Sequence, residues 1–226
     1  MKIAVFGTGM VGPTVAGALA ALGHDVVVGT RDPQATLART EAGPTGGVPF
    51  AQWHAEHGDI PVATFADAAA GSELVVNATN GTGSLDALTA AGAANLGGKV
   101  IMDIANPLDF SQGFPPSLNP VNTDSLAEQL QRAFPDARVV KTLNTMNATV
   151  MVDPSSVAAG DHSVFVSGND ADAKSVVAGL LADLGHRDII DLGDITTARG
   201  TEMLLPVWLR LWGALGNADF NFKIAR

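Results

Sequence analysis

The stretch from residue 2 to residue 33, KIAVFGTGMVGPTVAGALAALGHDVVVGTRDP, constrains the fold more than any other part of the chain. A short apolar run leads into Gly7, Gly9 and Gly12, which form the motif G-x-G-x-x-G. An alanine-rich segment with helical periodicity follows, ends at Gly23 and gives way to a second apolar run. The order strand, tight turn, helix, strand is the context in which this motif binds a dinucleotide.

Each glycine of the motif has a mechanical role. Gly7 lets the chain turn off the strand, Gly9 lets the backbone approach a pyrophosphate because it lacks a β-carbon, and Gly12 lets the helix pack closely on the sheet. The free N–H groups and partial positive charge at the helix N-terminus favour phosphate binding. We therefore expect the cofactor to contact the whole turn, which consists of Gly7, Thr8, Gly9, Met10, Val11 and Gly12.

The end of the second strand predicts which dinucleotide binds. NAD-selective versions of this unit carry Asp or Glu about 20 residues after the motif, to accept bonds from the ribose hydroxyls. Here that place holds Thr30 and Arg31. A carboxylate would repel a 2′-phosphate, whereas an arginine can bind it bidentately and a threonine can donate to it. The sequence predicts NADP(H); the competing interpretation is that Arg31 is a solvated loop charge beside Asp32.

Composition narrows the class of function. A net charge of −10 makes a nucleic-acid or anionic-membrane partner unexpected. The chain has no cysteine, which excludes thiolate catalysis and is typical of a cytoplasmic protein, and no tyrosine, which excludes the Tyr-Lys proton relay of short-chain dehydrogenases. No apolar run reaches the ~18 residues that span a bilayer, so we expect no membrane partner. His54 and His57 share a helix face without a third ligand nearby, and we predict no metal site.

Predicted strands and helices alternate along the rest of the chain. This pattern indicates an α/β fold with a doubly wound parallel sheet, Rossmann-like, and a small C-terminal helical extension. The first six strands predict the order 3-2-1-4-5-6, and two further strands extend the sheet. We expect residues 1–226 to form a single NADP-binding domain, with the dinucleotide-binding core at 1–150 and a C-terminal βαβ unit and terminal helix at 151–226.

Neutral side chains gather where three of the predicted strands end. Ligands bind at the carboxyl ends of strands in doubly wound sheets, so we expect the rest of the cofactor to lie against Ala78, Thr79, Asn80, Ala105, Asn106, Asn144 and Thr145. We predict loops at 80–84 and 105–123. Lys141 lies near the end of a strand, and His162 lies at the start of the next, which we expect to be the wrong end for the cleft; we interpret both as structural.

These neutral side chains also indicate the kind of chemistry. Hydride transfer to a carbonyl normally needs a proton donor, whereas amides and hydroxyls orient a ligand and do little acid–base work. We therefore assign no catalytic residue. The pattern favours hydride exchange between two cofactors, in which the rings carry the chemistry and the protein positions them.

Four segments resemble a known family. GTGMVG, LGHDVVVGTRD, FPDARVVKTLNT and LGDITTARGTEMLLPVWLRLW are similar to segments of the deazaflavin (coenzyme F-420)-dependent NADP oxidoreductases and of the NADPH-binding domains of six-transmembrane ferric reductases. The resemblance implies that Asn144 and Thr145 lie by the nicotinamide and that Thr30 and Arg31 bind the 2′-phosphate. The family's phenylalanine before Asn-Thr is Leu143 here. Arg199 is the best single candidate for contact with the acidic tail of a deazaflavin.

Three functions stay open at this point. The leading one is hydride transfer between NADP(H) and a deazaflavin (coenzyme F-420), or failing that a flavin. The second is an NADPH-dependent reductase of a small carbonyl or imine, with an acid that the sequence does not reveal. The third is an NADP(H)-responsive binding module without turnover.

The terminal helix, predicted at 201–215, is apolar almost all round. Trp208 and Trp212 share one face, and leucines spread over the others. We expect one face to cover the sheet and another to pack against a second subunit in a two-fold dimer, as in the resembling family. The alternative is an internal core helix of a monomer.

Overall fold

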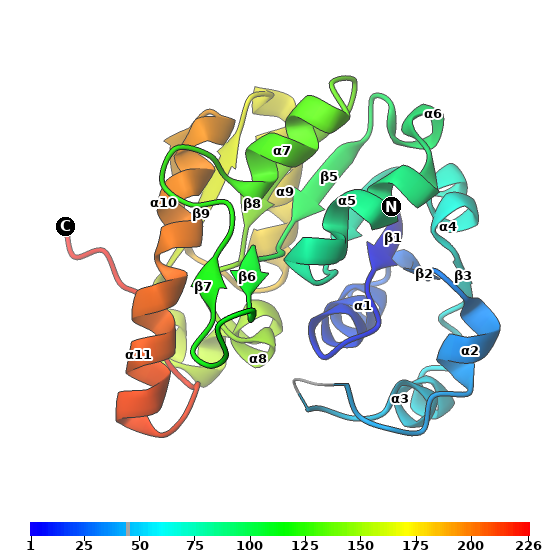
Figure 1. Ribbon diagram of the computed structural model, residues 1–226, viewed down its shortest axis with the longest axis horizontal. Coiled ribbons are helices and arrows are strands. Elements are labelled where there is room, and N and C mark those ends of the chain that lie inside the picture. The colour runs from blue at the N-terminus through cyan, green and yellow to red at the C-terminus, as the bar shows by residue number, and fades with distance from the viewer. Residues whose placement is uncertain (44–45) are drawn as a thin grey trace.

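The computed structural model describes residues 1–43 and 46–226, which form one eight-stranded sheet with helices on both faces (Figure 1). The strands of this sheet are β1 Lys2–Phe6, β2 Asp25–Thr30, β3 Val62–Thr64, β4 Leu74–Asn77, β5 Val100–Asp103, β8 Arg138–Thr142, β9 Ser163–Gly168 and β10 Asp188–Gly193. Their order is β10-β9-β8-β5-β4-β1-β2-β3. The predicted order of the first six strands is therefore confirmed.

The helices form two layers. They are α1 Val11–Ala21, α2 Pro33–Leu37, α3 Phe50–Glu56, α4 Phe65–Gly71, α5 Gly81–Ala91, α6 Ala93–Leu96, α7 Leu126–Ala133, α8 Ala148–Val152, α9 Ala171–Asp183, α10 Ala198–Met203 and α11 Leu205–Leu215. One core cluster joins the sheet to α1, α3, α8 and α9, and a second joins it to α4, α5, α7 and α10. Side-chain caps fix where several helices begin, because each accepts a free N–H of the first turn: Asp32, Thr64, Asn80, Ser125, Asn147 and Asp170.

The last two strands of the sheet run against the other six. Thr142 of β8 lies opposite Val166 of β9 in an antiparallel pairing, and β10 is parallel to β9. The sequence predicted a parallel extension, but the connection from β8 to β9 returns to the edge at which β8 ends, through α8 and the short turns η1 Pro154–Ser156 and η2 Ala158–Gly160. His162 therefore lies at the carboxyl edge of β8, and its prediction at the opposite edge was wrong.

His162 is nonetheless a buried side chain with its own partners. Its Nε2 lies 3.0 Å from the carbonyl oxygen of Pro154, and its Nδ1 lies 2.8 Å from the amide nitrogen of Asn221. Asn221 belongs to the C-terminal segment, which returns to β9, where the N–H of Ser163 donates to the carbonyl of Phe222. These contacts agree with a structural role for the imidazole.

Two predicted loops and the terminal helix differ in detail from the structure. Residues 81–84 form the first turn of α5, because Asn80 caps it and because Gly81 allows the helix to approach Asn106 closely; a β-carbon on Gly81 would lie 2.1 Å from the carbonyl oxygen of Asn106. The segment 105–123 contains a small antiparallel pair, β6 Leu108–Asp109 and β7 Ser117–Leu118. The terminal helix is two helices, with α10 ending just before Leu204. Among the described residues, no helix combines the length and apolarity needed to cross a bilayer.

Candidate functional site

The glycine turn after β1 has the geometry that its motif predicts. Gly7 has a φ of +121°, and a β-carbon on it would lie 2.3 Å from the carbonyl oxygen of Ala78. A β-carbon on Gly12 would lie 2.0 Å from the carbonyl oxygen of Gly7. At Gly9, by contrast, no atom of the described residues, apart from its chain neighbours, lies within 4 Å of the place a β-carbon would take. Two glycines thus close the turn tightly, and the third leaves the space that the motif needs for the close approach of a pyrophosphate.

A cavity of about 400 Å³ lies beside this turn, at the ends of β1 and β2. Its lining includes four residues that the sequence assigned to the cofactor: Gly7, Thr8, Thr30 and Arg31. Thr30 is buried, and its hydroxyl lies 2.8 Å from the hydroxyl of Thr36. Arg31 is exposed and forms no ion pair with any described residue. Hydroxyls and a free guanidinium in one cavity are groups that suit a phosphate.

Arg39 lines the same cavity, and sequence reasoning missed it. One of its terminal nitrogens lies 3.2 Å from the hydroxyl of Thr8, and the other donates to the Thr8 carbonyl. Its guanidinium carbon lies 5.7 Å from the ring centre of Phe50, within the range of a cation–π contact. No motif marks Arg39, because it reaches the glycine turn only through the fold of the segment after α2.

The predicted residues at the ends of β5 and β8 also come together. The side-chain amide of Asn106 donates to the carbonyl of Asn144 at 2.8 Å, and the amide of Asn144 donates to the side-chain oxygen of Asn106 at 3.0 Å. Asn144 and Thr145 are each only 2% exposed. Leu143, just before them, has a φ of +57°, which is strained for a branched residue. This turn directs the reciprocal Asn106–Asn144 pair to the carboxyl edge of the sheet.

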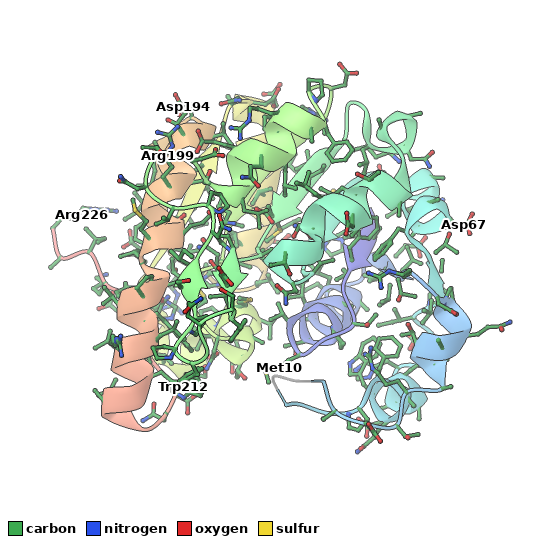
Figure 2. The ribbon with its side chains drawn as sticks, in the orientation of Figure 1. Met10, Asp67, Asp194, Arg199, Trp212 and Arg226 are labelled. Atoms are coloured by element: carbon green, nitrogen blue, oxygen red, sulfur yellow. The ribbon has the colours of Figure 1, made fainter. Side chains whose placement is uncertain are left out.

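The remaining predicted contacts lie near the same edge and differ in their hydrogen bonds and in their exposure to solvent. The Thr79 hydroxyl donates to the side-chain oxygen of Asn77 at 2.7 Å. The side chain of Asn80 caps α5. Met10 is exposed immediately before α1, where Figure 2 labels it, and Val11 is half-buried in the first turn of that helix. Ala78 and Ala105 follow the ends of β4 and β5, so only their backbone groups could bind a polar ligand.

Lys141 lies behind this edge and is fully buried. Its ammonium donates to Asp103 at 2.9 Å, to Glu202 at 2.8 Å and to the carbonyl of Ala105. Burial alone would lower the pKa of Lys141, but the Asp103 and Glu202 carboxylates outweigh burial and raise that pKa above its ordinary value. Lys141 therefore stays charged and has no donor left for a ligand, which agrees with a structural interpretation.

Arg199 does not face the cleft as a free cation. Its guanidinium binds both carboxylate oxygens of Glu128, at 2.8 and 2.5 Å, and the hydrogen bond from Arg199 lowers the pKa of that carboxyl. Figure 2 shows Arg199 near Asp194 at the start of α10, in a different part of the view from Met10. The expectation that Arg199 binds an acidic substrate tail is not supported by this arrangement.

Comparisons with known proteins point to one family. A family profile described as "NADP oxidoreductase coenzyme F420-dependent" matches residues 2–107. A solved structure of a candidate F420-dependent NADP reductase from Arthrobacter sp. FB24 is 72% identical, with a TM-score of 0.96 over 100% of both chains.

Two curated relatives match at lower identity. The F420-dependent NADP reductase of Methanocaldococcus jannaschii is 29% identical over 117 residues, which are 51% of this chain and 52% of that protein. Metalloreductase STEAP3 of Rattus norvegicus is 26% identical over 212 residues, which are 92% of this chain and 38% of that protein. This chain thus spans about half or less of the length of these two relatives. The profile across the glycine motif and the full-length Arthrobacter relative together show that the chain belongs to the family of coenzyme F420-dependent NADP oxidoreductases.

Proposed function

We propose that this protein transfers hydride between NADP(H) and a deazaflavin of the coenzyme F-420 type, or a flavin. The observation that carries the proposal is the chemistry of the carboxyl edge. Asn106, Asn144, Thr79 and Thr145 place amides and hydroxyls at that edge, and all three donors of the Lys141 ammonium are engaged by Asp103, Glu202 and Ala105. Such groups can orient two flat rings but do not supply a proton to a carbonyl.

We assign the binding of NADP(H) mainly to the β1–β2 end. The turn from Gly7 to Gly12 and the N-terminus of α1 would hold the pyrophosphate, because Gly9 leaves the required space open. Thr30 and Arg31 would hold the 2′-phosphate, and Arg39 would support the turn from the other side of the cavity through Thr8. Local cations are needed here, since the whole chain carries a net charge of −10.

We assign orientation of the nicotinamide to the β4–β5–β8 end. Bound NADPH would supply the hydride. Asn144 and Thr145 would orient the carboxamide or the ring edge, with Asn106 holding Asn144 in place through two hydrogen bonds. Ala78, Thr79, Asn80 and Ala105 would shape the wall beside them with backbone groups and small side chains.

An absorbance assay tests this function. NADPH, the protein and a deazaflavin are mixed, and loss of the deazaflavin's visible absorbance is followed against a reaction without protein. We expect loss of absorbance that matches NADPH oxidation. Oxidation of NADPH by a carbonyl or imine panel but not by a deazaflavin or flavin would favour the small-molecule reductase instead, and tight NADPH binding without any turnover would favour a binding module.

We also propose a two-fold dimer through α11. Within the single chain only Leu205 of this helix is buried, whereas Val207, Trp212 and Leu215 are 50%, 40% and 54% exposed. An internal core helix would not leave these side chains in water. Light scattering should give twice the mass of 23.1 kDa, and Trp212→Glu should give a folded monomer. A mass near 23.1 kDa for the unchanged protein would contradict the dimer.

A further inference from the structure

We propose that Lys141 is a positioning residue, which fixes the nicotinamide end of the cleft through a buried chain of hydrogen bonds without touching the cofactor itself. The inference rests on the proposed function, because it assumes that the nicotinamide binds where β4, β5 and β8 end. It assigns a role to a charged cluster that the binding contacts leave unexplained.

The cluster is closed to solvent, and every N–H donor of its central ammonium has a partner. The side chains of Lys141 and Asp103 are 0% exposed, and that of Glu202 is 3% exposed. An ammonium has three N–H donors, and those of Lys141 go to Asp103, Glu202 and the Ala105 carbonyl. Asp103 and Ala105 lie at the carboxyl end of β5 and Glu202 lies in α10, so the ammonium of Lys141 joins β8, the end of β5 and α10.

From Asp103 the chain of bonds leads to the cleft. The other carboxylate oxygen of Asp103 accepts the side-chain amide of Asn77 at 2.8 Å and the backbone N–H of Ala105 at 3.3 Å. Asn77 in turn donates to Ser84 at 3.0 Å and accepts the hydroxyl of Thr79 at 2.7 Å. Lys141 therefore contacts one of the predicted cofactor contacts, Ala105, directly at its carbonyl, and reaches another, Thr79, through Asp103 and Asn77.

On the opposite side, Glu202 carries the second carboxylate of the cluster. Two carboxylates face one ammonium, but Glu202 also accepts the free N–H groups of Leu126 and Ala127 at 2.9 and 3.2 Å, in the first turn of α7. A helix N-terminus stabilises negative charge. The excess carboxylate is thus satisfied, and α10 is tied to the sheet and to α7 at one point.

A buried polar network in which every member is satisfied holds its members in one arrangement, because leaving any of them unpaired is costly. The hydroxyl of Thr79 and the backbone of Ala105 are consequently set before a cofactor binds. Small errors in the placement of reacting groups cost large factors in rate. Loosening the cluster should therefore affect the nicotinamide more than the distant phosphates.

A matched pair of variants separates this role from simple stability. Glu202→Gln weakens the ion pair with Lys141, whereas Glu128→Gln weakens the ion pair with Arg199, which also joins α7 to α10 but has no bond to Lys141. We expect both to bind NADPH within about 3-fold of the unchanged protein. Only Glu202→Gln should shift the fluorescence of bound NADPH towards that of free NADPH and lower hydride transfer, by about 10- to 100-fold.

A second pair keeps the test decisive if Glu202→Gln fails to fold. Ser84→Ala removes one hydroxyl at the cleft end of the network, and Ser72→Ala removes a buried hydroxyl that donates to the carbonyl of Ala69, outside the Lys141 network. Ser84→Ala should shift the fluorescence of bound NADPH and Ser72→Ala should not. Equal behaviour within each folded pair would overturn the inference alone. Failure of the unchanged protein to bind NADPH would overturn the proposed function together with this inference.

Discussion

At the β1–β2 end of the cleft, Arg31 is exposed beside a cavity of about 400 Å³, whereas at the β4–β5–β8 end Ala105, Asn144 and Thr145 are buried and Asn144 is bonded to the half-buried Asn106. Asn144 and Thr145 are each 2% exposed, and the Asn106–Asn144 pair is closed on itself. The first end offers charge and space. The second offers fixed neutral groups.

This difference indicates that the two ends serve different purposes, binding affinity at one and ring placement at the other. Charge-assisted bonds to phosphates contribute most of the affinity for a dinucleotide, while a ring that exchanges hydride needs accurate placement more than tight binding. Changes at the open end should therefore alter the affinity for NADP(H). Changes at the buried end should alter the rate.

The largest expected effect is at the glycine turn. Gly9→Ala should place a methyl group where the pyrophosphate must approach, and NADPH binding should weaken by at least ~100-fold while the circular dichroism spectrum is unchanged. Gly12→Ala is the contrasting variant, since its methyl would meet the Gly7 carbonyl and should disturb the fold itself. Retained tight binding by a folded Gly9→Ala protein would contradict the assignment of the phosphate site.

Arg31→Ala should have the next largest effect. If Arg31 binds the 2′-phosphate as proposed, the variant loses a bidentate charge-assisted contact worth about 2 kcal/mol, so NADPH affinity measured by calorimetry should fall roughly 30-fold, while NADH affinity stays nearly constant. Arg39→Ala should weaken both cofactors, because Arg39 holds Thr8 of the shared turn. If Arg31→Ala weakens both cofactors equally, Arg31 is structural and the NADP preference has another source.

Asn144→Ala sharpens the comparison from the buried end. It breaks the reciprocal bonds with Asn106, so turnover should drop by about 10-fold while the dissociation constant of NADP⁺ changes far less. Steady-state kinetics and calorimetry on the same preparation measure the two quantities. An unchanged turnover number would move the reaction centre elsewhere, most plausibly towards the segment 105–123.

The smallest effect concerns acid stability near α7. Hydrogen bonds from Arg132 lower the pKa of Asp124 from 3.8 to about 2. A carboxyl with a depressed pKa stabilises the folded state above pH 3.8, and this contribution is lost as the pH falls towards about 2. The pair is partly exposed, so the contribution should be under ~1 kcal/mol. Arg132→Gln should remove it, and identical unfolding curves of the two proteins at pH 3 and at pH 6 would show that the pair contributes nothing.

The local structure at the β1–β2 end could be predicted in detail because its signals are local. The glycine spacing, the following helix and the Thr30–Arg31 pair lie within one βαβ unit, and right-handed crossovers then determine the strand order. The direction of β9 could not be predicted, because it depends on whether the connection after β8 crosses the sheet. Arg39 was missed for a similar reason: its contact with Thr8 exists only after α2 and α3 have packed.

At the β4–β5–β8 end, the sequence predicted which residues lie at the strand ends but not the buried ion pairs behind them. The pattern of neutral side chains at strand ends singled out Asn106 and Asn144, which the structure brings together, but nothing local pairs Lys141 with Glu202 from a distant helix. Lys141, in the segment FPDARVVKTLNT, and Glu202, in the segment LGDITTARGTEMLLPVWLRLW, were both visible in the sequence. Their common burial is a property of the assembled sheet.

Direct transfer of label tests the proposed function most sharply. NADPH carrying deuterium at the reactive carbon of the nicotinamide is oxidised by the protein in the presence of a deazaflavin, and both products are analysed by mass spectrometry. We expect the deuterium that leaves the cofactor to appear on the reduced deazaflavin, because two rings held together exchange hydride without a proton relay. Deuterium found in the solvent, or an unchanged deazaflavin beside tightly bound NADPH, would contradict hydride transfer between the two rings.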